Sequence, residues 1–172
     1  MTQLYAQPYN IDANGFYFED AEEFKKKSHN LCDSFGQPAE EFEIQWIEGE
    51  VIDQQLFKAL NISQSNIELF LEKIEEWTDE DKEKVLIKCE LYPTLNVKDV
   101  DPDDIDIVYY KVSSMKDLAE QFVDEGYYGD LSTMPDALKN YIDYDSIAND
   151  LRCSGEYGEI DINNEHIIYS CC

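Results

Sequence analysis

The stretch IDIVYYKVSSMKDLAEQFVDEG (residues 105–126) decides the fold class, because its hydrophobic pattern changes from that of a strand to that of a helix. Residues 105–111 are rich in β-branched and aromatic side chains and predict a strand. Either Ser113 or Ser114 can cap the helix that follows, in which apolar residues recur at helical spacing until Gly126 predicts its end. A strand and a helix in one short segment are typical of an α+β fold.

The N-terminal part of the chain shows the same mixture of patterns. Two short strands (4–9 and 16–18) flank a turn-forming IDANG, and Asp20 can cap a helix that extends to about Phe35. The segment EEFEIQWIEG (40–49) alternates between apolar and polar residues. It therefore predicts a half-buried strand with an acidic outer face.

The middle of the chain predicts three short helices, which should pack as a small bundle because none is long enough to be stable alone. Their expected caps are Asp53, then Ser65 or Asn66, then Thr78 in a capping box with Asp81. After a segment with two prolines (93–104), the C-terminal part predicts the elements of 105–126, a short helix after Pro135, a helix over 141–151, and a hairpin of 157–160 with 166–169.

These patterns predict three small domains. They are an N-terminal α+β domain (1–60), a central helical domain (61–103) and a C-terminal α+β domain (104–172). The length of 172 residues allows two or three such units. With 13% aromatic residues, the chain has enough apolar material to form cores, which argues against disorder.

Acidic residues dominate the composition. Asp and Glu number 39 against 13 Lys and Arg, for a net charge of -26, and the segments 1–60, 61–100 and 101–172 carry -8, -5 and -13. The charge is therefore a property of the whole surface and not of a tail. Such a surface repels nucleic acid and anionic membranes, so we expect neither as a partner. It favours a protein partner that binds polyanions.

Motifs for catalysis or cofactor binding are absent from the sequence. It contains no phosphate-binding loop, dinucleotide fingerprint or zinc-protease motif, and five cysteines without a C-x-x-C pair do not predict a disulfide framework. We therefore expect no enzyme activity, no catalytic residues, no cofactor and no metal. The beginning of the chain does not resemble a signal peptide, and no apolar run is long enough to span a membrane, so we expect a cytoplasmic protein.

Three alternatives to a protein that binds a polyanion-binding partner can be weighed. Residues 99–106 (DVDPDDID) suit calcium in ligand type, but Asp104 stands where an EF-hand loop needs Gly and Tyr110 where it needs a bidentate Glu. An acidic calcium-binding or regulatory module is therefore the second hypothesis. Halophilic adaptation is disfavoured, because twelve of the thirteen basic residues are Lys. A thiol and base pair of Cys32 with His29 is a weaker possibility.

The helix over 114–125 illustrates how the charge is arranged. Asp117, Glu120 and Asp124 recur on its outer face, where like charges destabilise a helix by roughly 0.2–0.5 kcal/mol per pair. At the charge density of duplex DNA, one charge per about 1.7 Å, 26 net charges correspond to roughly 44 Å, or about 13 base pairs. The charge thus suits a protein that imitates a length of duplex.

Several segments resemble the ArdA-type antirestriction proteins. The most specific are SMKDLAEQFVDEGYYGDL (114–131) and YIDYDSIANDL (141–151), and the segments 4–24, 40–49 and 155–171 are similar too. The resemblance covers nearly the whole chain. It implies a protein of mobile genetic elements that mimics DNA, occupies the DNA-binding groove of the methyltransferase core of type I restriction-modification enzymes, and blocks DNA binding and restriction. Whether modification is blocked as well stays open at this point.

The resemblance also implies an elongated row of three small domains, joined into a homodimer through the C-terminal domain. The family's antirestriction motif corresponds to about 108–131, and the cysteine-containing form of that motif is absent. The expected partner-binding, phosphate-mimicking carboxylates are Asp117, Glu120, Asp124, Glu125, Asp130, Asp143 and Asp145. The expected dimer interface consists of Val108, Tyr109, Tyr110 and Val112.

Overall fold

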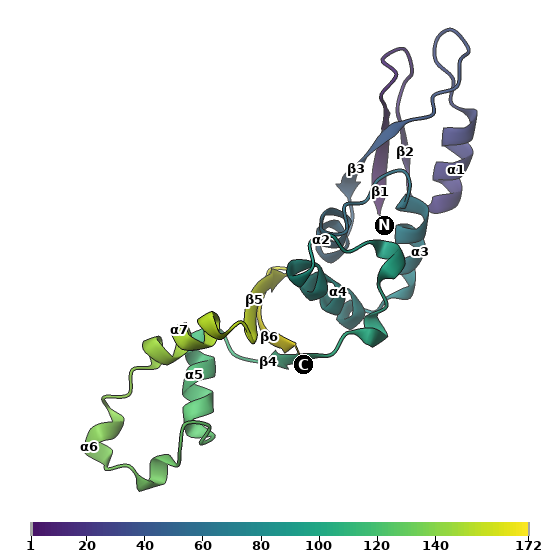
Figure 1. Ribbon diagram of the computed structural model, residues 1–172. Coiled ribbons are helices and arrows are strands. Elements are labelled where there is room, and N and C mark those ends of the chain that lie inside the picture. Colours follow the sequence, from purple (N-terminus) through teal and green to yellow (C-terminus); the bar gives the residue numbers. More distant parts are fainter. Residues whose placement is uncertain (1, 172) are drawn as a thin grey trace. The chain divides into compact units, whose positions relative to one another are not determined.

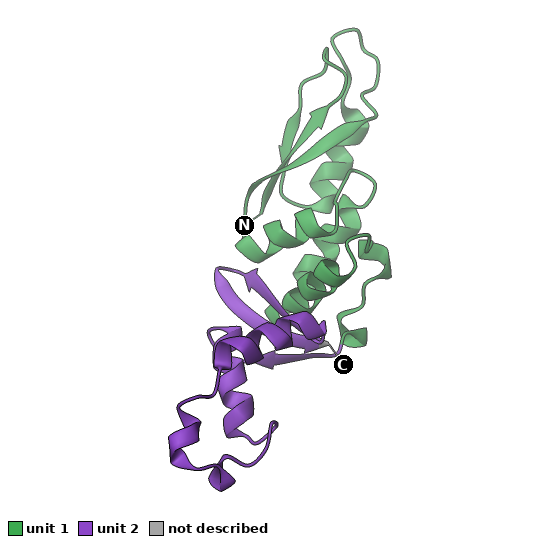
Figure 2. Cartoon of the chain, turned by 60° about the vertical axis from the view of Figure 1, so that its left-hand side comes forward, with its two compact units in different colours: residues 1–105 green, residues 106–172 purple. Residues whose placement is uncertain are grey.

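The computed structural model describes residues 2–171 and divides the chain into two compact units, Met1–Ile105 and Asp106–Cys172 (Figure 2). Each unit contains one three-stranded antiparallel sheet together with helices. The expected α+β fold class is confirmed. Within the described residues, every helix is too short or too polar to cross a lipid bilayer.

The sheet of unit 1 consists of β1 (Gln3–Pro8), β2 (Phe16–Phe18) and β3 (Phe42–Glu48) in the order β2-β1-β3 (Figure 1). All three strands were predicted. Phe42 and Ile44 of β3 are buried and Trp46 is half-buried, while the predicted outer residues Glu41, Glu43 and Gln45 are exposed, so the half-buried strand with an acidic outer face is confirmed. Helix α1 (Ala21–Asn30) packs its buried Phe24 against the ring of Phe18.

Helix α1 begins as predicted and ends earlier than predicted. Asp20 caps it by accepting a hydrogen bond from the amide of Glu23, but the helix stops at Asn30 instead of continuing to about Phe35. The cause is Asp33, whose carboxylate accepts the backbone amides of Phe35 and Gln37. Short polar side chains that bond the local backbone in this way compete with helix formation.

Unit 1 also contains the helices α2 (Val51–Ala59), α3 (Ile67–Glu76) and α4 (Asp79–Leu91). The capping box of Thr78 and Asp81 is present, as predicted. Asp53 was expected to cap α2, but Glu50 is at that position and Asp53 is buried inside the helix, paired with Lys82 of α4 at 2.7 Å. The segment after α4 forms two 3-10 turns, Val97–Asp99 and Pro102–Asp104, which contact α3 and α4.

The sheet of unit 2 consists of β4 (Ile107–Tyr110), β5 (Tyr157–Ile162) and β6 (Glu165–Cys171) in the order β4-β6-β5. The predicted closing hairpin of β5 and β6 is confirmed. Its turn consists of Asn163 and Asn164, both at positive φ, a conformation that asparagine tolerates better than most residues. Gly158 of β5 lies under the ring of Tyr169, which would collide with any side chain at that position.

Helices α5 (Met115–Asp124) and α7 (Tyr144–Ser154) pack against each other and against the sheet of unit 2. Ser114 caps α5 and Gly126 follows its end at positive φ, both as predicted. Between the two helices lie a 3-10 turn (Leu131–Thr133) and the short helix α6 (Asp136–Lys139). The core of the unit consists of Met115, Leu118, Ala119, Phe122, Ala148, Leu151 and Ile168.

Candidate functional site

The carboxylates predicted on α5 lie on its outer face. The apolar stripe of this helix is buried, while Glu120 and Asp124 are exposed and Asp117 is half-buried. Glu125, just beyond the helix, is exposed, and its carboxylate accepts a hydrogen bond from the side-chain Nε2 of Gln121 at 2.8 Å. The helix therefore presents acidic groups to solvent along the side that does not pack in the core.

The start of α7 brings two more of the predicted carboxylates next to α5. Lys116 of α5 donates a hydrogen bond to Asp145 at 2.8 Å, and the two side chains are 45% and 76% exposed. This hydrogen bond raises the pKa of Lys116, and the charges of Glu120 and Asp143 add to the rise. Carboxylates from two helices thus surround a single ammonium group. We call Lys116, Glu120, Asp143 and Asp145 the Lys116 cluster.

Two of the predicted carboxylates also have local structural roles. Asp143 caps α7 by accepting hydrogen bonds from the amide and the hydroxyl of Ser146, and Asp130 caps the 3-10 turn of 131–133 through the amide of Ser132. The bonds from Ser146 lower the pKa of Asp143, and those from Ser132 lower the pKa of Asp130. Both groups therefore remain anionic under mildly acidic conditions.

The four residues predicted at a dimer interface differ in burial and in the side of the sheet that they face. Successive residues of a strand point to opposite sides of the sheet, so Tyr109 points away from the side that Val108 and Tyr110 occupy. Tyr110 and Val112 pack against the core of unit 2, and the ring of Tyr110 contacts those of Phe122 and Tyr157. Val108 has 41% of its surface exposed and lies on an edge strand of the sheet.

The structure adds aromatic residues that the sequence analysis did not single out. Tyr127, Tyr128 and Tyr141 are close in sequence to the candidate carboxylates Glu125, Asp130 and Asp143. All three tyrosines are exposed, Tyr141 by 83%. Next to them is a pocket of about 290 Å³ with a mainly apolar lining, to which Val123, Tyr128, Gly129, Asp130, Leu131, Thr133, Met134, Ile142 and Ile147 contribute. The dipeptide of Tyr127 and Tyr128 between Gly126 and Gly129 was the available signal in the sequence.

A family comparison covers most of the chain. The family model described as antirestriction protein (ArdA) matches residues 11–163 of 172. The chain belongs to the ArdA antirestriction family. No curated protein matches the sequence significantly. Membership in ArdA, a family of inhibitor proteins, implies an antirestriction function. The match spans both units and includes all seven candidate carboxylates.

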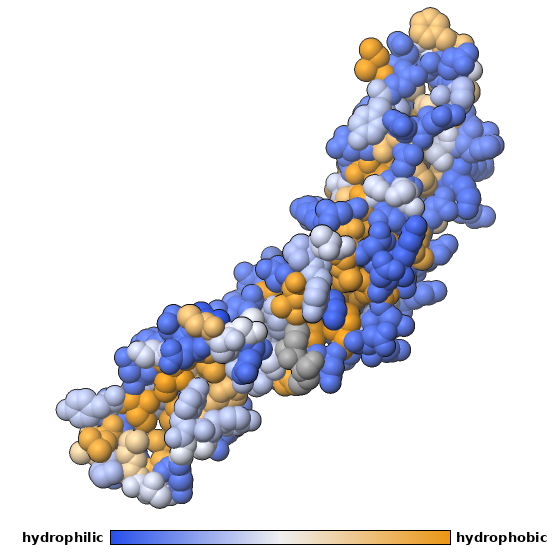
Figure 3. Space-filling view, in the orientation of Figure 1, coloured by the Kyte–Doolittle hydropathy of each residue, from blue (hydrophilic) through white to orange (hydrophobic). Residues whose placement is uncertain are grey.

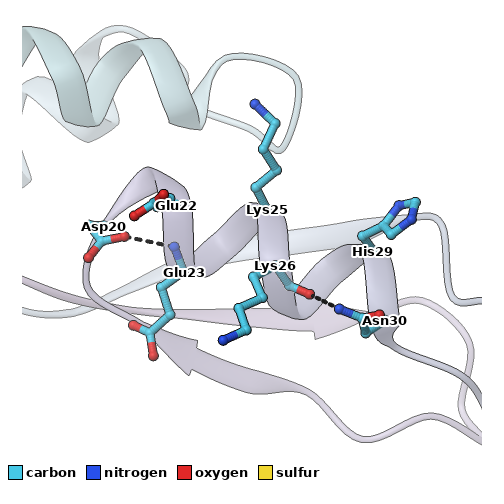
Figure 4. Close-up of a pocket in the computed structure, with 7 residues that line it drawn as sticks. All are labelled: Asp20, Glu22, Glu23, Lys25, Lys26, His29 and Asn30. Carbon is cyan, nitrogen blue, oxygen red and sulfur yellow. Dashed lines mark hydrogen bonds between the residues drawn. The ribbon is translucent and has the colours of Figure 1, made fainter.

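The ArdA match also covers α1, where a hollow is lined by charges of both signs (Figure 4). Asp20 is engaged in capping the helix, and Lys25 is paired with Glu68 of α3 at 3.0 Å. Cys32 is exposed and lies beyond the end of α1, where its backbone forms an isolated β-bridge with Pro38. It is therefore outside the helix that was expected to present it next to His29. The hollow thus lacks the concentration of one charge seen in the Lys116 cluster.

No group of three or more His, Cys, Asp or Glu side chains suited to a metal ion converges within the described part of this ArdA chain. In the Asp-rich segment, Asp101 accepts a hydrogen bond from the amide of Asp103 and caps the second 3-10 turn. This carboxylate thus has a local structural role. The alternation of carboxylates in residues 99–106 suggested calcium in the sequence, and in the structure this segment contains the capped 3-10 turn Pro102–Asp104.

His166 of this ArdA chain is expected to titrate above its ordinary pKa of 6.5. Its Nδ1 is 2.8 Å from Asp161, and this hydrogen bond raises the pKa, with Glu159 adding to the effect. Because the folded state favours the protonated imidazole, the stabilisation is full below pH 6.5 and is lost as the pH rises through the folded-state pKa.

An NMR titration of the two histidines, assigned with His166→Gln and His29→Gln variants, measures this pKa. The thermal midpoint of His166→Gln should fall below that of the unchanged protein at pH 5.5 and approach it at pH 8.5. A midpoint of titration for His166 below 6.5 would contradict the expectation.

Proposed function

We propose that this ArdA-family protein acts as a DNA mimic that binds the DNA-binding groove of a type I restriction-modification enzyme and excludes DNA competitively. The observation that carries the proposal is the surface of unit 2, where candidate carboxylates of α5 and α7 and of the segment between them are exposed and outnumber the basic groups around them. A groove that binds duplex DNA is lined with basic side chains, and an acidic surface is complementary to them.

The electrostatic properties of unit 2 support this proposal. Lys116 neutralises only part of the charge of the three carboxylates around it, so the Lys116 cluster remains anionic. Asp130 and Asp143 are anionic at physiological pH, as exposed carboxylates and phosphates both are, and their lowered pKa values extend this charge to more acidic conditions. Exposed pairs such as Lys116 with Asp145 contribute little stability, so the partner can replace them at low cost.

The proposal extends to the assembly. We infer that the partner surface is the methyltransferase core, that two copies form a homodimer through residues 104–172, and that three small domains (1–60, 61–103 and 104–172) form an elongated row. A dimer carries twice the net charge of -26 and, at the charge density of DNA, corresponds to roughly 26 base pairs. Val108 on the exposed edge strand is the predicted dimer residue with the most accessible side chain among the four.

A displacement titration tests the proposed function. The purified protein should release a labelled DNA duplex from a type I methyltransferase at micromolar or lower concentration and low salt, and its affinity should decrease as salt rises. The same duplex on an unrelated basic DNA-binding protein provides the control for nonspecific polyanion effects. Failure to displace DNA from the methyltransferase under these conditions refutes the proposal.

A further inference from the structure

Two loops lie side by side at one end of unit 1 (Figures 1 and 2). One joins β1 to β2 (residues 9–15) and the other joins α1 to β3 (31–41). We call residues 9–14 and 33–38 the tip. Two large apolar side chains of the tip, Ile11 and Phe35, are 95% and 76% exposed. Figure 3 shows hydrophobic side chains at this end of unit 1 among hydrophilic ones.

Hydrogen bonds connect the two loops of the tip. The amide of Ser34 donates to the carbonyl of Asp12 at 3.0 Å, and the side chain of Asn10 donates to the carboxylate of Asp33, also at 3.0 Å. Because residues 10 and 33 are far apart in sequence, these bonds hold one loop against the other. The relative position of Ile11 and Phe35 is thus determined before any partner binds.

Each loop also has its own internal bonds. The side chain of Asn10 accepts a hydrogen bond from the amide of Asp12, and that of Asp33 accepts hydrogen bonds from the amides of Phe35 and Gln37. The bonds from Gln37 and Phe35 are among the causes that lower the pKa of Asp33. Fixing the backbone of a residue costs roughly 1–2 kcal/mol of conformational entropy. The tip is ordered in this way although it buries neither Ile11 nor Phe35.

Preorganised apolar side chains on a rigid support are the anchors that contribute most to protein interfaces, since little ordering cost remains to be met on binding. The charges around the tip indicate the partner. Residues 9–14 and 33–41 contain four carboxylates (Asp12, Asp33, Glu40 and Glu41) and no basic residue. An apolar hollow rimmed by Lys or Arg is complementary to an apolar pair with an acidic rim.

We propose that the tip is an anchor through which Ile11 and Phe35 insert into an apolar hollow with a basic rim on the restriction-modification enzyme. This inference rests on the proposed function and assigns the tip a contribution that is independent of charge mimicry. A second copy of the chain is a poorer occupant, because its tip has the same acidic rim. An anionic membrane is a poorer one for the same reason.

The test compares the unchanged protein with an Ile11→Asn/Phe35→Ser double variant in binding to a purified type I methyltransferase over a range of salt concentrations. Both side chains are exposed, so the double variant should keep its fold and thermal midpoint. We expect its Kd to be raised roughly 10- to 100-fold. The change should persist at high salt, because the lost contact is apolar.

Two further variants make the test specific. Val51→Asn replaces an apolar residue of α2 that is also exposed and lies outside the tip, and it should leave Kd unchanged. Asp33→Ala keeps both anchors but removes the bond from Asn10, one of the two bonds that hold the loops together, and the bonds from the amides of Phe35 and Gln37 within the second loop. It should raise Kd as well, by a smaller factor, because the anchors must then be ordered on binding.

The outcomes separate this inference from the proposed function. Methyltransferase binding that is equal for the unchanged protein and the double variant overturns the anchor and leaves the DNA-mimic proposal intact. Failure of the unchanged protein to bind overturns both. A different occupant would be indicated by self-association of the unchanged protein in sedimentation or by its binding to neutral or anionic lipid vesicles. If the double variant loses that property while its Kd for the methyltransferase stays the same, the tip has a different occupant and the inference is overturned.

Discussion

Replacing Lys82 by Met is expected to lower the free energy of unfolding of unit 1 by about 3–5 kcal/mol at pH 7. Lys82 of α4 and Asp53 of α2 form an ion pair at 2.7 Å, and 7% of each side chain is exposed. Without the ammonium group, the Asp53 carboxylate is left buried and unpaired, which costs far more than the lost attraction of an exposed pair. Tryptophan fluorescence in urea reports this transition, since Trp46 and Trp77, the only tryptophans, both lie in unit 1.

The pH dependence of this variant provides a second measurement. Burial raises the pKa of Asp53, and Lys82 opposes the rise. When the pKa of a carboxyl group is higher in the folded state than in the unfolded state, stability is lost as the pH rises from the unfolded-state pKa through the folded-state pKa. Removing Lys82 raises the pKa further. The loss in free energy of unfolding caused by Lys82→Met should therefore be largest at pH 7 and decrease as the pH falls towards 4.

A matched variant distinguishes the unpaired charge from simple loss of packing. Asp53→Leu/Lys82→Met removes both charges and should be considerably more stable than Lys82→Met alone, because a buried ion pair can be replaced by apolar side chains at little cost. A loss below 1 kcal/mol in the single variant at pH 7, or a deficit that does not change with pH, would show that Asp53 is solvated in the folded protein.

Changing Glu120, Asp124 and Asp145 together to amides is expected to weaken binding to the methyltransferase by roughly 3- to 150-fold, since each exposed charge contributes about 0.2–1 kcal/mol. These three carboxylates are exposed and belong to α5 and α7 of unit 2. The salt dependence of binding should become weaker in parallel. Asp117→Asn alone should scarcely change binding, because the charge acts collectively.

The control for this triple variant keeps the charge and changes only the side-chain length, with Glu120→Asp, Asp124→Glu and Asp145→Glu. It should bind almost as tightly as the unchanged protein if charge is what the partner recognises. Thermal unfolding of both sets verifies that the fold is kept. A single amide that abolishes binding in a folded protein would instead identify a hot spot and contradict a distributed mimic.

Features governed by neighbouring residues could be predicted from the sequence. The cap of α5 by Ser114, the capping box at Thr78 and the glycine stop at Gly126 all depend on residues within one turn. The strands followed from alternation over a few residues. The acidic surface followed from composition, because so many carboxylates cannot be buried.

Features that depend on distant residues could not be predicted. Asp53 seemed suited to a helix cap because its partner Lys82, 29 positions later, comes close only when α2 and α4 pack. The end of α1 depends on Asp33, which is held by Asn10 from another loop. The different burial of the predicted dimer residues also depends on distant contacts, because Tyr110 and Val112 pack against the core of unit 2 while Val108 is exposed.

The sequence by itself determined the α+β class, the helix caps and turns, the net charge of -26, and the resemblance that the family match confirmed. Each of these depends on composition or on residues near one another in the chain. Only the tertiary structure decided which carboxylates gather around Lys116 and which apolar side chains, Ile11 and Phe35 above all, stay exposed on a rigid support. The reason is that burial and charge pairing are set by contacts between segments far apart in sequence, which form only when the helices and loops pack.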